Sequence, residues 1–142
     1  MTARLKGRRR QVEAVIASLT EWVREREDVV GLAVVGSYAY GRPRMGSDVD
    51  LVLLTTEPDN YLHDLAWTGS FARRPRLIRT EQWGPMAERR IRLPSGLQVE
   101  LGITTPAWLA LPLDPGTARV LRDGHRILHD PQNLFTKALA EL

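Results

Sequence analysis

The sequence predicts an α/β (α+β) fold in which helices pack on a mixed β-sheet. Residues 8–27 repeat apolar side chains with the period of a helix. Residues 29–35 and 48–55 are short apolar runs with many β-branched side chains, which favours buried strands. Residues 97–104 alternate apolar and polar side chains, as a strand with one buried face does. Strands and helices mixed along one chain are typical of a sheet with helices packed against it.

The length and composition of the chain agree with one folded domain. Of its 142 residues, 43% are hydrophobic and 26% are charged, which excludes intrinsic disorder as the main state. Since domains most often hold about 100–150 residues, we expect a single domain over residues 1–142. The sequence has no Cys, so disulfides and thiolate chemistry are excluded. Without a secretory leader or an apolar stretch of about 20 residues, we expect a cytoplasmic protein with no membrane partner.

The first half of the chain predicts a helix, a strand–loop–strand unit and a second helix. The helix over residues 8–27 has an apolar face made of Val12, Val15, Ile16, Leu19, Trp22 and Val23. The strand–loop–strand unit spans residues 29–55, and its loop is rich in glycine. Residues 59–72 predict the second helix, whose inward side chains are Tyr61, Leu62, Leu65 and Ala66.

The second half of the chain predicts a more β-rich arrangement. Gly84 and Pro85 form a turn signal between strands at 76–83 and 86–93. An acidic strand at 97–104 follows. Asp114 and Pro115 suit the N-cap and first position of a short helix that continues to Leu121. The chain then predicts an edge strand at 126–128 and a helical tail at 131–142.

Asp48 and Asp50 form the first candidate site. On a strand, residues two apart share one face, so the two carboxylates repel each other. A divalent cation relieves this repulsion, and Mg²⁺ binds carboxylates together with substrate phosphates. The alternative is an acidic pair that is exposed at the start of a strand.

Gly36 and Ser37 stand where the first strand ends, and they suggest a phosphate site. Glycine lets a phosphate approach the backbone closely, and Ser37 offers a hydroxyl and an amide. A plain tight turn is the alternative. The spacing of Gly36 and Gly41 is that of a P-loop, but Arg42 and Pro43 follow in place of Lys and Ser/Thr, which excludes a Walker motif.

Glu100 is a third candidate, since an acid in an otherwise apolar strand needs a partner or a role. If its strand is next to that of Asp50, the three carboxylates form a cup. Such a cup can hold two metals about 3.5–4 Å apart for in-line phosphoryl displacement. The alternative is a Glu on the solvent face of an antiparallel sheet.

Residues 36–51, with Gly36-Ser37, Gly41 and Ser47-Asp48-Val49-Asp50-Leu51, resemble the signature of the polymerase-beta-type nucleotidyltransferase superfamily, G-S-x-A/Y-x-G-x(n)-S-D-x-D-L. The resemblance implies a nucleotidyltransferase fold, an NTP substrate and two Mg²⁺ ions, with Mn²⁺ as a substitute. It implies that Gly36 and Ser37 hold the triphosphate and that Asp48 and Asp50 bind metal. The family's third acid is usually Asp, and the matching position here is Glu100.

A small single-domain member of this superfamily would move an NMP group, AMP from ATP, to an acceptor hydroxyl and release pyrophosphate. Asp48, Asp50 and Glu100 are then the catalytic residues, and we expect Ser47, Arg42 and Arg44 to contact the nucleotide. We expect the acceptor to be a small molecule or a protein, bound by a wall that comes from the residues after Thr104, a homodimer or a separate helical chain. Two alternatives stay open: an antitoxin or nucleotide-binding partner protein with weak or no catalysis, and a cation-binding domain without nucleotide.

Three other groups of residues receive simpler interpretations. The net charge is +3, and the arginines at 73–79 and 89–92 are interpreted as a solvated face, because few aromatic side chains lie between them, so we expect no nucleic-acid partner. For the tryptophans at 67, 83 and 108, packing is favoured over stacking on a base. The histidines at 125 and 129 are not expected to bind metal.

Overall fold

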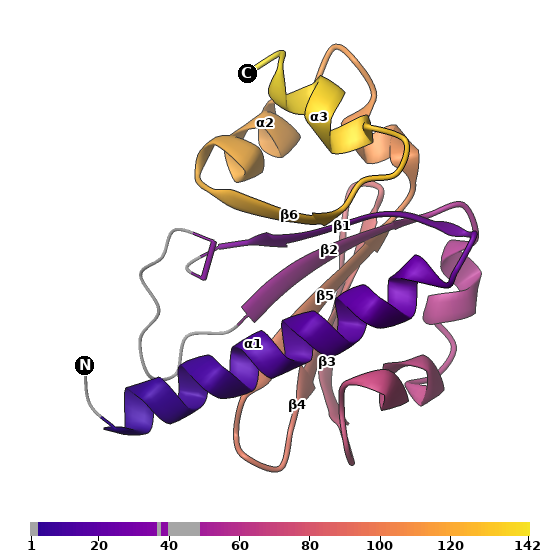
Figure 1. The fold of residues 1–142 in the computed structure, drawn as a ribbon. Helices are drawn as coiled ribbons and strands as arrows, with labels where there is room; N and C mark the ends of the chain where they lie inside the picture. Colours follow the sequence, from indigo (N-terminus) through magenta and orange to yellow (C-terminus); the bar gives the residue numbers. More distant parts are fainter. Residues whose placement is uncertain (1–2, 37, 40–48) are drawn as a thin grey trace.

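The computed structural model describes residues 3–36, 38–39 and 49–142. Six strands form one sheet in the order β3-β4-β5-β2-β1-β6 (Figure 1). They are β1 (Val29–Val35), β2 (Val49–Thr55), β3 (Arg76–Trp83), β4 (Met86–Arg92), β5 (Gln98–Thr104) and β6 (His125–His129). The pair β2–β5 is parallel and the other neighbours are antiparallel. The mixed sheet with helices packed on it confirms the expected fold class.

Helix α1 (Ala3–Arg24) covers one face of this sheet (Figure 1). Its buried side chains Val12, Val15, Ile16, Leu19 and Val23 match the predicted apolar face. The helix begins earlier than residue 8 because the added turn consists mostly of good helix formers. It ends before residue 27 because the amides of Glu25 and Arg26 bond back only three residues, to Trp22 and Val23.

The opposite face of the sheet is covered in part by the C-terminal elements: η3 (Pro106–Leu109), α2 (Pro115–Arg122) and α3 (Leu134–Leu139). They form a second, smaller core together with β1 and β2. The strands contribute Val35 and Val52, and the C-terminal elements contribute Trp108, Leu121 and Phe135. Strand β3 and most of β4 and β5 are outside this cover, although Met86 at the start of β4 packs against the second core. One half of that sheet face is therefore left open beside the C-terminal elements.

The helix predicted over residues 59–72 is wrong. Two short 3-10 turns stand there instead, η1 (Pro58–Tyr61) and η2 (Ala66–Ser70). The buried guanidinium of Arg89 donates to the carbonyl oxygens of Tyr61 (3.0 Å) and Asp64 (2.8 Å), and Trp67 Nε1 also donates to Tyr61. A helix needs these carbonyls for its own amides, so the side chains compete with the helical ladder. Of the four residues expected to face inward, Tyr61 is buried and Ala66 is exposed.

The predicted C-terminal order is confirmed, with a shorter last helix. Asp114 caps α2 by accepting from the amides of Gly116 and Thr117, at 2.9 and 3.3 Å. Strand β6 pairs with β1 at the edge of the sheet. Helix α3 begins only at Leu134, because Asn133 has a left-handed φ of 58°. No helix in the described part of the chain is both long and apolar enough to cross a membrane.

Candidate functional site

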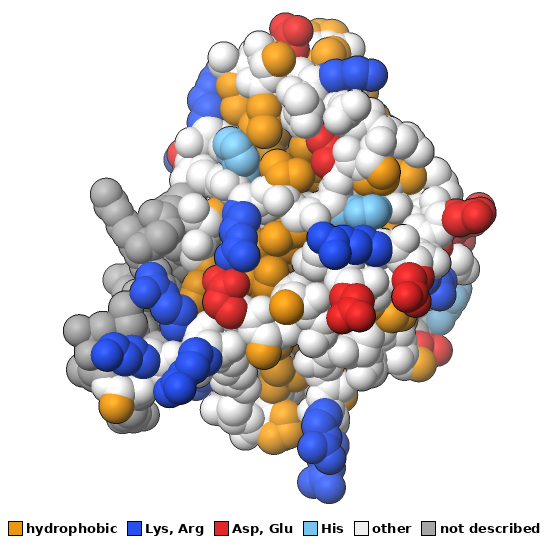
Figure 2. Space-filling view, viewed as in Figure 1, with side chains coloured by type: hydrophobic (Ala, Val, Ile, Leu, Met, Phe, Trp, Pro, Cys, Tyr) orange, Lys and Arg blue, Asp and Glu red, His pale blue; other side chains and the backbone are white. Residues whose placement is uncertain are grey.

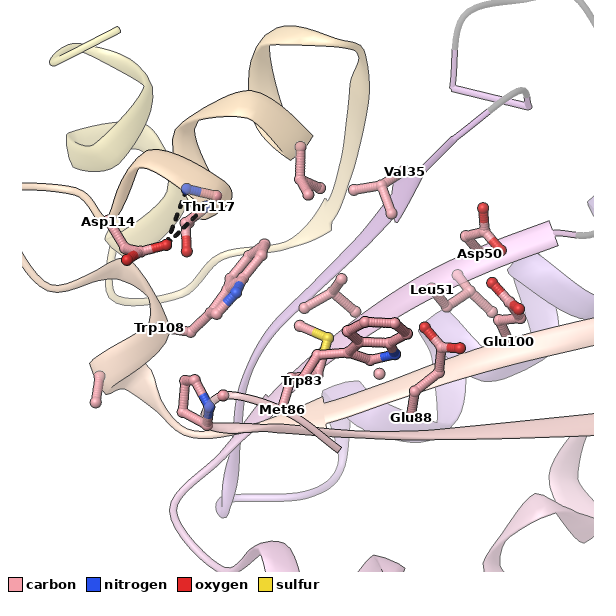
Figure 3. A pocket seen from close by; sticks show the side chains of 17 residues that line it. Val35, Asp50, Leu51, Trp83, Met86, Glu88, Glu100, Trp108, Asp114 and Thr117 are labelled. Carbon is pink, nitrogen blue, oxygen red and sulfur yellow. Dashed lines mark hydrogen bonds between the residues drawn. The ribbon is translucent and has the colours of Figure 1, made fainter. Parts of the chain in front are cut away.

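Two of the predicted acids meet where β2 and β5 run side by side. Asp50 and Glu100 are direct partners in the parallel register of these strands. Since Val52 lies two residues after Asp50 and belongs to the second core, Asp50 is on the face that the C-terminal elements cover in part. Figure 3 shows the two carboxylate side chains beside each other at the starts of their strands. The strand adjacency on which the predicted carboxylate cup depends is therefore present.

The two acids line one end of a cavity of about 690 Å³. The other end is more apolar and includes Met86, Trp83 and Trp108 (Figure 3). The cavity lies between the open half of the sheet, the hairpin that joins β3 to β4, and the first turn of α2. It therefore offers carboxylates next to an apolar space of the size of a small-molecule site.

Gly36 brings the backbone at the end of β1 against Asp50. Its φ is +79°, a left-handed value that glycine adopts without strain. A Cβ atom at this position would lie 2.3 Å from Asp50 Oδ2, which is shorter than any real contact. The glycine that opens the motif is therefore required by close packing against the carboxylate of its last aspartate.

The carboxylate of Glu100 is held by two arginines. Arg90, its direct partner on β4, forms an ion pair with it, and Arg79 Nη2 on β3 lies 3.4 Å from Glu100 Oε1. Arg90 also donates to Gln98 Oε1 at 3.1 Å. Only 14% of the Glu100 side chain is exposed. The interpretation of Glu100 as a freely solvated Glu is thus wrong, because it is a partly buried acid with charged partners.

Sequence reasoning missed Arg79 and Arg90 as part of this site. The sequence predicts a solvated arginine cluster for both, since nothing in the sequence fixes which residues of β3 and β4 face Glu100. The bulge between Leu77 and Arg79 shifts the register of β3 and brings Arg79 opposite Arg90. A shift of one residue changes the face of every side chain that follows it.

Several predicted site residues lie outside the described residues: Ser37, Arg42, Arg44, Ser47 and Asp48. Within the described part of the chain, no group of three or more His, Cys, Asp or Glu side chains is arranged to hold a metal. Asp50 and Glu100 supply the oxygen donors that Mg²⁺ prefers, so the residues present fit a hard cation. The same ion would compete with Arg90 for the carboxylate of Glu100.

The other candidates separate into core and cavity residues. Trp67 packs with Trp22, Tyr61 and Phe71 in an aromatic cluster. Trp83 and Trp108 line the cavity, and 57% of Trp83 is exposed. His125 and His129 lie on β6, where the His125 ring contacts the carbonyl oxygen of Leu121 at 2.9 Å.

Comparison with known proteins identifies a family for the chain. The family model described as nucleotidyltransferase domain matches residues 16–92. None of the curated proteins matches the chain. Among solved structures, the Cid1 poly(U) polymerase is similar, with 17% identity and a TM-score of 0.46 over 72% of this chain and 31% of that one.

A second similar structure is terminal uridylyl transferase 4 from Trypanosoma brucei with bound GTP, with 22% identity and a TM-score of 0.39 over 66% of this chain and 30% of that one. The chain thus spans about a third of the length of these two proteins. The family model covers more than half of the chain and includes Gly36 and Asp50, although Glu100 lies beyond it. This protein therefore belongs to the nucleotidyltransferase domain family, within the polymerase-beta-type superfamily that its motif at residues 36–51 predicts.

Proposed function

We propose that this protein transfers AMP from ATP to an acceptor hydroxyl and releases pyrophosphate. The observation that carries the proposal is the register of β2 and β5, which sets Asp50 beside Glu100 at the end of a cavity. Gly36, at the end of β1, completes the described part of the site. The family assignment supports the transfer of a nucleoside monophosphate in general. ATP as the donor is our specific expectation, as is a cytoplasmic location.

Each predicted residue has a role in this proposal. Asp48, Asp50 and Glu100 would hold Mg²⁺, two ions in the full complement, with Mn²⁺ able to replace them. The bound ions would neutralise the charge of the triphosphate and lower the pKa of the acceptor hydroxyl. The backbone at Gly36 and Ser37, with Ser47, Arg42 and Arg44, would contact the phosphates.

In the transfer step, the acceptor oxygen attacks the α-phosphorus of ATP. The new phosphorus–oxygen bond forms as the bond to the bridging oxygen of the β-phosphate breaks, and pyrophosphate leaves with that electron pair. In this proposal Glu100 would accept the hydroxyl proton once Arg90 and Arg79 release its carboxylate. The protein contributes the positions of the reacting groups and a fixed arrangement of charge.

The open half of the sheet leaves room for the acceptor. A second copy of the chain or a separate helical protein would complete the wall opposite β3 and β4, around a small-molecule or protein acceptor. We propose the acceptor site for this open face, because the face adjoins Asp50 and Glu100. The single-domain organisation over residues 1–142 remains part of this proposal.

One observation favours a second function, that of a nucleotide-binding partner protein or antitoxin with little catalysis. The ion pairs of Glu100 with Arg90 and Arg79 already neutralise the third acid. If these pairs persist when nucleotide binds, Asp48 and Asp50 would hold one Mg²⁺·ATP complex without activating an acceptor. Nucleotide binding and turnover must therefore be measured separately.

The test measures ATP-dependent thermal stabilisation and pyrophosphate release, both in Mg²⁺, for the wild type and the variants Asp48→Asn, Asp50→Asn and Glu100→Gln. We expect both signals to be lost in the two aspartate variants, and release to fall in Glu100→Gln. The exposed Glu27→Gln is the matched control, expected to behave as the wild type. Stabilisation without release in the wild type supports the second function. Equal stabilisation in all five proteins would refute any nucleotide site at these acids.

A further inference from the structure

The open sheet face beside the acids carries four arginines in two cross-strand pairs. Arg79 is opposite Arg90, and Arg76 is opposite Arg92, on β3 and β4. Arg90 and Arg79 reach Glu100, and Arg92 lies two residues after Arg90, so all four positions belong to the face that carries Asp50 and Glu100. The two arginine clusters, which are separate segments in the sequence, therefore meet on one surface.

Like charges directly opposite each other destabilise a strand pair unless an anion lies between them. For the pair Arg79–Arg90, Glu100 is that anion. Arg76 and Arg92 are both exposed, and among the described residues neither forms an ion pair. The second arginine pair thus presents uncompensated positive charge to the solvent, next to the pair that contacts the third acid.

Charge is separated along the strands of this face. On the cavity side of the Arg79–Arg90 pair lie Glu81 and Glu88, which are also opposite each other and which both approach Arg79. On the other side lie Arg76 and Arg92. A polyanion that starts at the acids and their cations would be repelled by the glutamates on the cavity side, and it would be attracted along the two arginine pairs.

The spacing of the arginine pairs suits a chain of phosphates. The two pairs are two residues apart on β4, which corresponds to about 6.6–6.8 Å along an antiparallel strand. Successive phosphates of a single-stranded nucleic acid have a comparable spacing. Guanidinium groups bind phosphate oxygens in a bidentate way, so each pair is suited to clamp one phosphate.

We propose that the acceptor is the end of a single-stranded nucleic acid, whose last phosphates lie on Arg79–Arg90 and Arg76–Arg92 and whose terminal hydroxyl reaches Asp50 and Glu100. This inference rests on the proposed function and names its acceptor class. With a cation held by Glu100, Arg79 and Arg90 would be free to contact the phosphate that precedes the terminal hydroxyl. Adenylyl transfer would then extend the strand by one nucleotide, with release of pyrophosphate.

The test measures binding of a fluorescein-labelled single-stranded RNA, and of DNA of the same sequence, by fluorescence anisotropy over a range of salt concentrations in EDTA and in Mg²⁺. The variant is Arg76→Gln/Arg92→Gln. The matched control is Arg10→Gln/Arg24→Gln, which removes the same charge from exposed positions of α1 on the opposite face. In Figure 2 the face with α1 shows basic side chains around the N-terminal end of this helix, so it controls for unspecific attraction.

We expect the wild type to bind, and the Arg76→Gln/Arg92→Gln variant to bind roughly tenfold more weakly in Mg²⁺. Its salt slope should fall by about 0.7, the value for the one phosphate that this arginine pair clamps, while the α1 control should keep most of the affinity. No binding by the wild type, or equal losses in both double variants, would overturn the proposal. A difference between RNA and DNA identifies which strand is the acceptor.

The same samples separate this proposal from the proposed function. ATP-dependent stabilisation in Mg²⁺ reports the nucleotide site, and the double variant Arg76→Gln/Arg92→Gln should keep it. ATP stabilisation without strand binding would overturn the nucleic-acid acceptor and leave the nucleotide site intact. Strand binding that depends on Arg76 and Arg92, without ATP stabilisation, would refute the proposed nucleotide site and leave the arginine face as a nucleic-acid surface.

Discussion

Gly36 shows how one residue fixes the geometry of the candidate site. Its left-handed φ and the 2.3 Å separation between a hypothetical Cβ and Asp50 Oδ2 mean that a side chain here would strain the backbone and push the Asp50 carboxylate aside. We expect Gly36→Ala to lower the free energy of unfolding by about 1–2 kcal/mol through backbone strain. Because the new methyl group also displaces the Asp50 carboxylate, the variant should lose ATP-dependent stabilisation. Urea unfolding and thermal shift measure the two effects.

Gly7 provides the control for this substitution. It lies inside α1, and a Cβ there would meet no atom within 4 Å. Gly7→Ala should therefore raise the free energy of unfolding by about 0.5–1 kcal/mol, the usual gain from replacing a helical glycine. A Gly36→Ala variant as stable as the wild type would contradict the tight packing at Asp50.

Replacing Arg90 should change stability and cation affinity in opposite directions. It forms an ion pair with Glu100 and donates to Gln98, so Arg90→Gln should lower the melting temperature of the cation-free protein. It also removes a competitor for the Glu100 carboxylate, and we therefore expect Mn²⁺ to bind several-fold more tightly. Isothermal titration calorimetry measures this affinity. The exposed Arg24→Gln is the control, and unchanged Mn²⁺ affinity in Arg90→Gln would show that the guanidinium does not compete.

At the scale of elements, the junction of α1, β1, β2 and η1 is held by one partly buried carboxylate, that of Asp28. Tyr61 and Thr55 both donate to Asp28 Oδ2, the latter at 2.9 Å. Burial raises the pKa of Asp28, but these two hydrogen bonds and Arg26 outweigh it and leave the pKa lowered. Burial and the hydrogen bond to Asp28 raise the pKa of Tyr61 to about 12.

These pKa shifts predict losses of stability at both ends of the pH range. The ionised Asp28 contributes to the free energy of unfolding above its unfolded pKa of 3.8. This contribution is lost as the pH falls through the lower pKa of the folded state. The contribution of Tyr61 is present below pH 10.0 and is lost as the pH rises toward 12. Thermal melts over this range measure both limbs.

Two variants test which residue causes the fall of the melting temperature at each end of the pH range, that is, its acid limb and its alkaline limb. Tyr61→Phe should lower the melting temperature at neutral pH and flatten the alkaline limb, part of which persists because burial also raises the pKa of Tyr38. Asp28→Asn should flatten the acid limb. An alkaline limb that is unchanged in Tyr61→Phe would show that this junction does not control it.

The elements also show what the sequence can and cannot predict. The strands can be predicted from local pattern. The runs at 29–35 and 76–83 are strands with those bounds, because a strand depends on the side chains within its own segment. The helix expected at 59–72 fails because Arg89, more than twenty positions away, takes the carbonyls of Tyr61 and Asp64. In the site, Glu100 is found as an acid in need of a partner. Its arginine partners depend on the β3–β4 register and the bulge, which no single-strand pattern contains.

At the scale of the whole molecule, the sheet separates two cores that share its strands. The larger core lies under α1 and the smaller one under η3, α2 and α3. Phe135 of α3 is fully buried in the smaller core, so Phe135→Ala should cost about 3–5 kcal/mol. If residues 1–142 are one cooperative domain, far-UV circular dichroism and tryptophan fluorescence will report one shifted transition in urea.

The half-exposed Val120 of α2 provides the comparison, since Val120→Ala should change the free energy of unfolding little. Two separate transitions in Phe135→Ala, one for each probe, would show that the C-terminal elements unfold on their own. In that case the single-domain prediction would be wrong, although the site between β2 and β5 would stand.

The parallel pairing of β2 with β5 has a consequence for the order of events in folding. Asp50 and Glu100 are fifty positions apart along the chain, whereas β3, β4 and β5 follow one another through short turns. Closing the long loop between β2 and β5 costs more entropy than forming a hairpin, so the β2–β5 pair should form late in folding. A refolding chain would thus acquire most of its secondary structure before its two acids meet. Nucleotide binding would then begin only when β2 and β5 have paired. The time at which a refolding sample first binds nucleotide would therefore report the last step of folding.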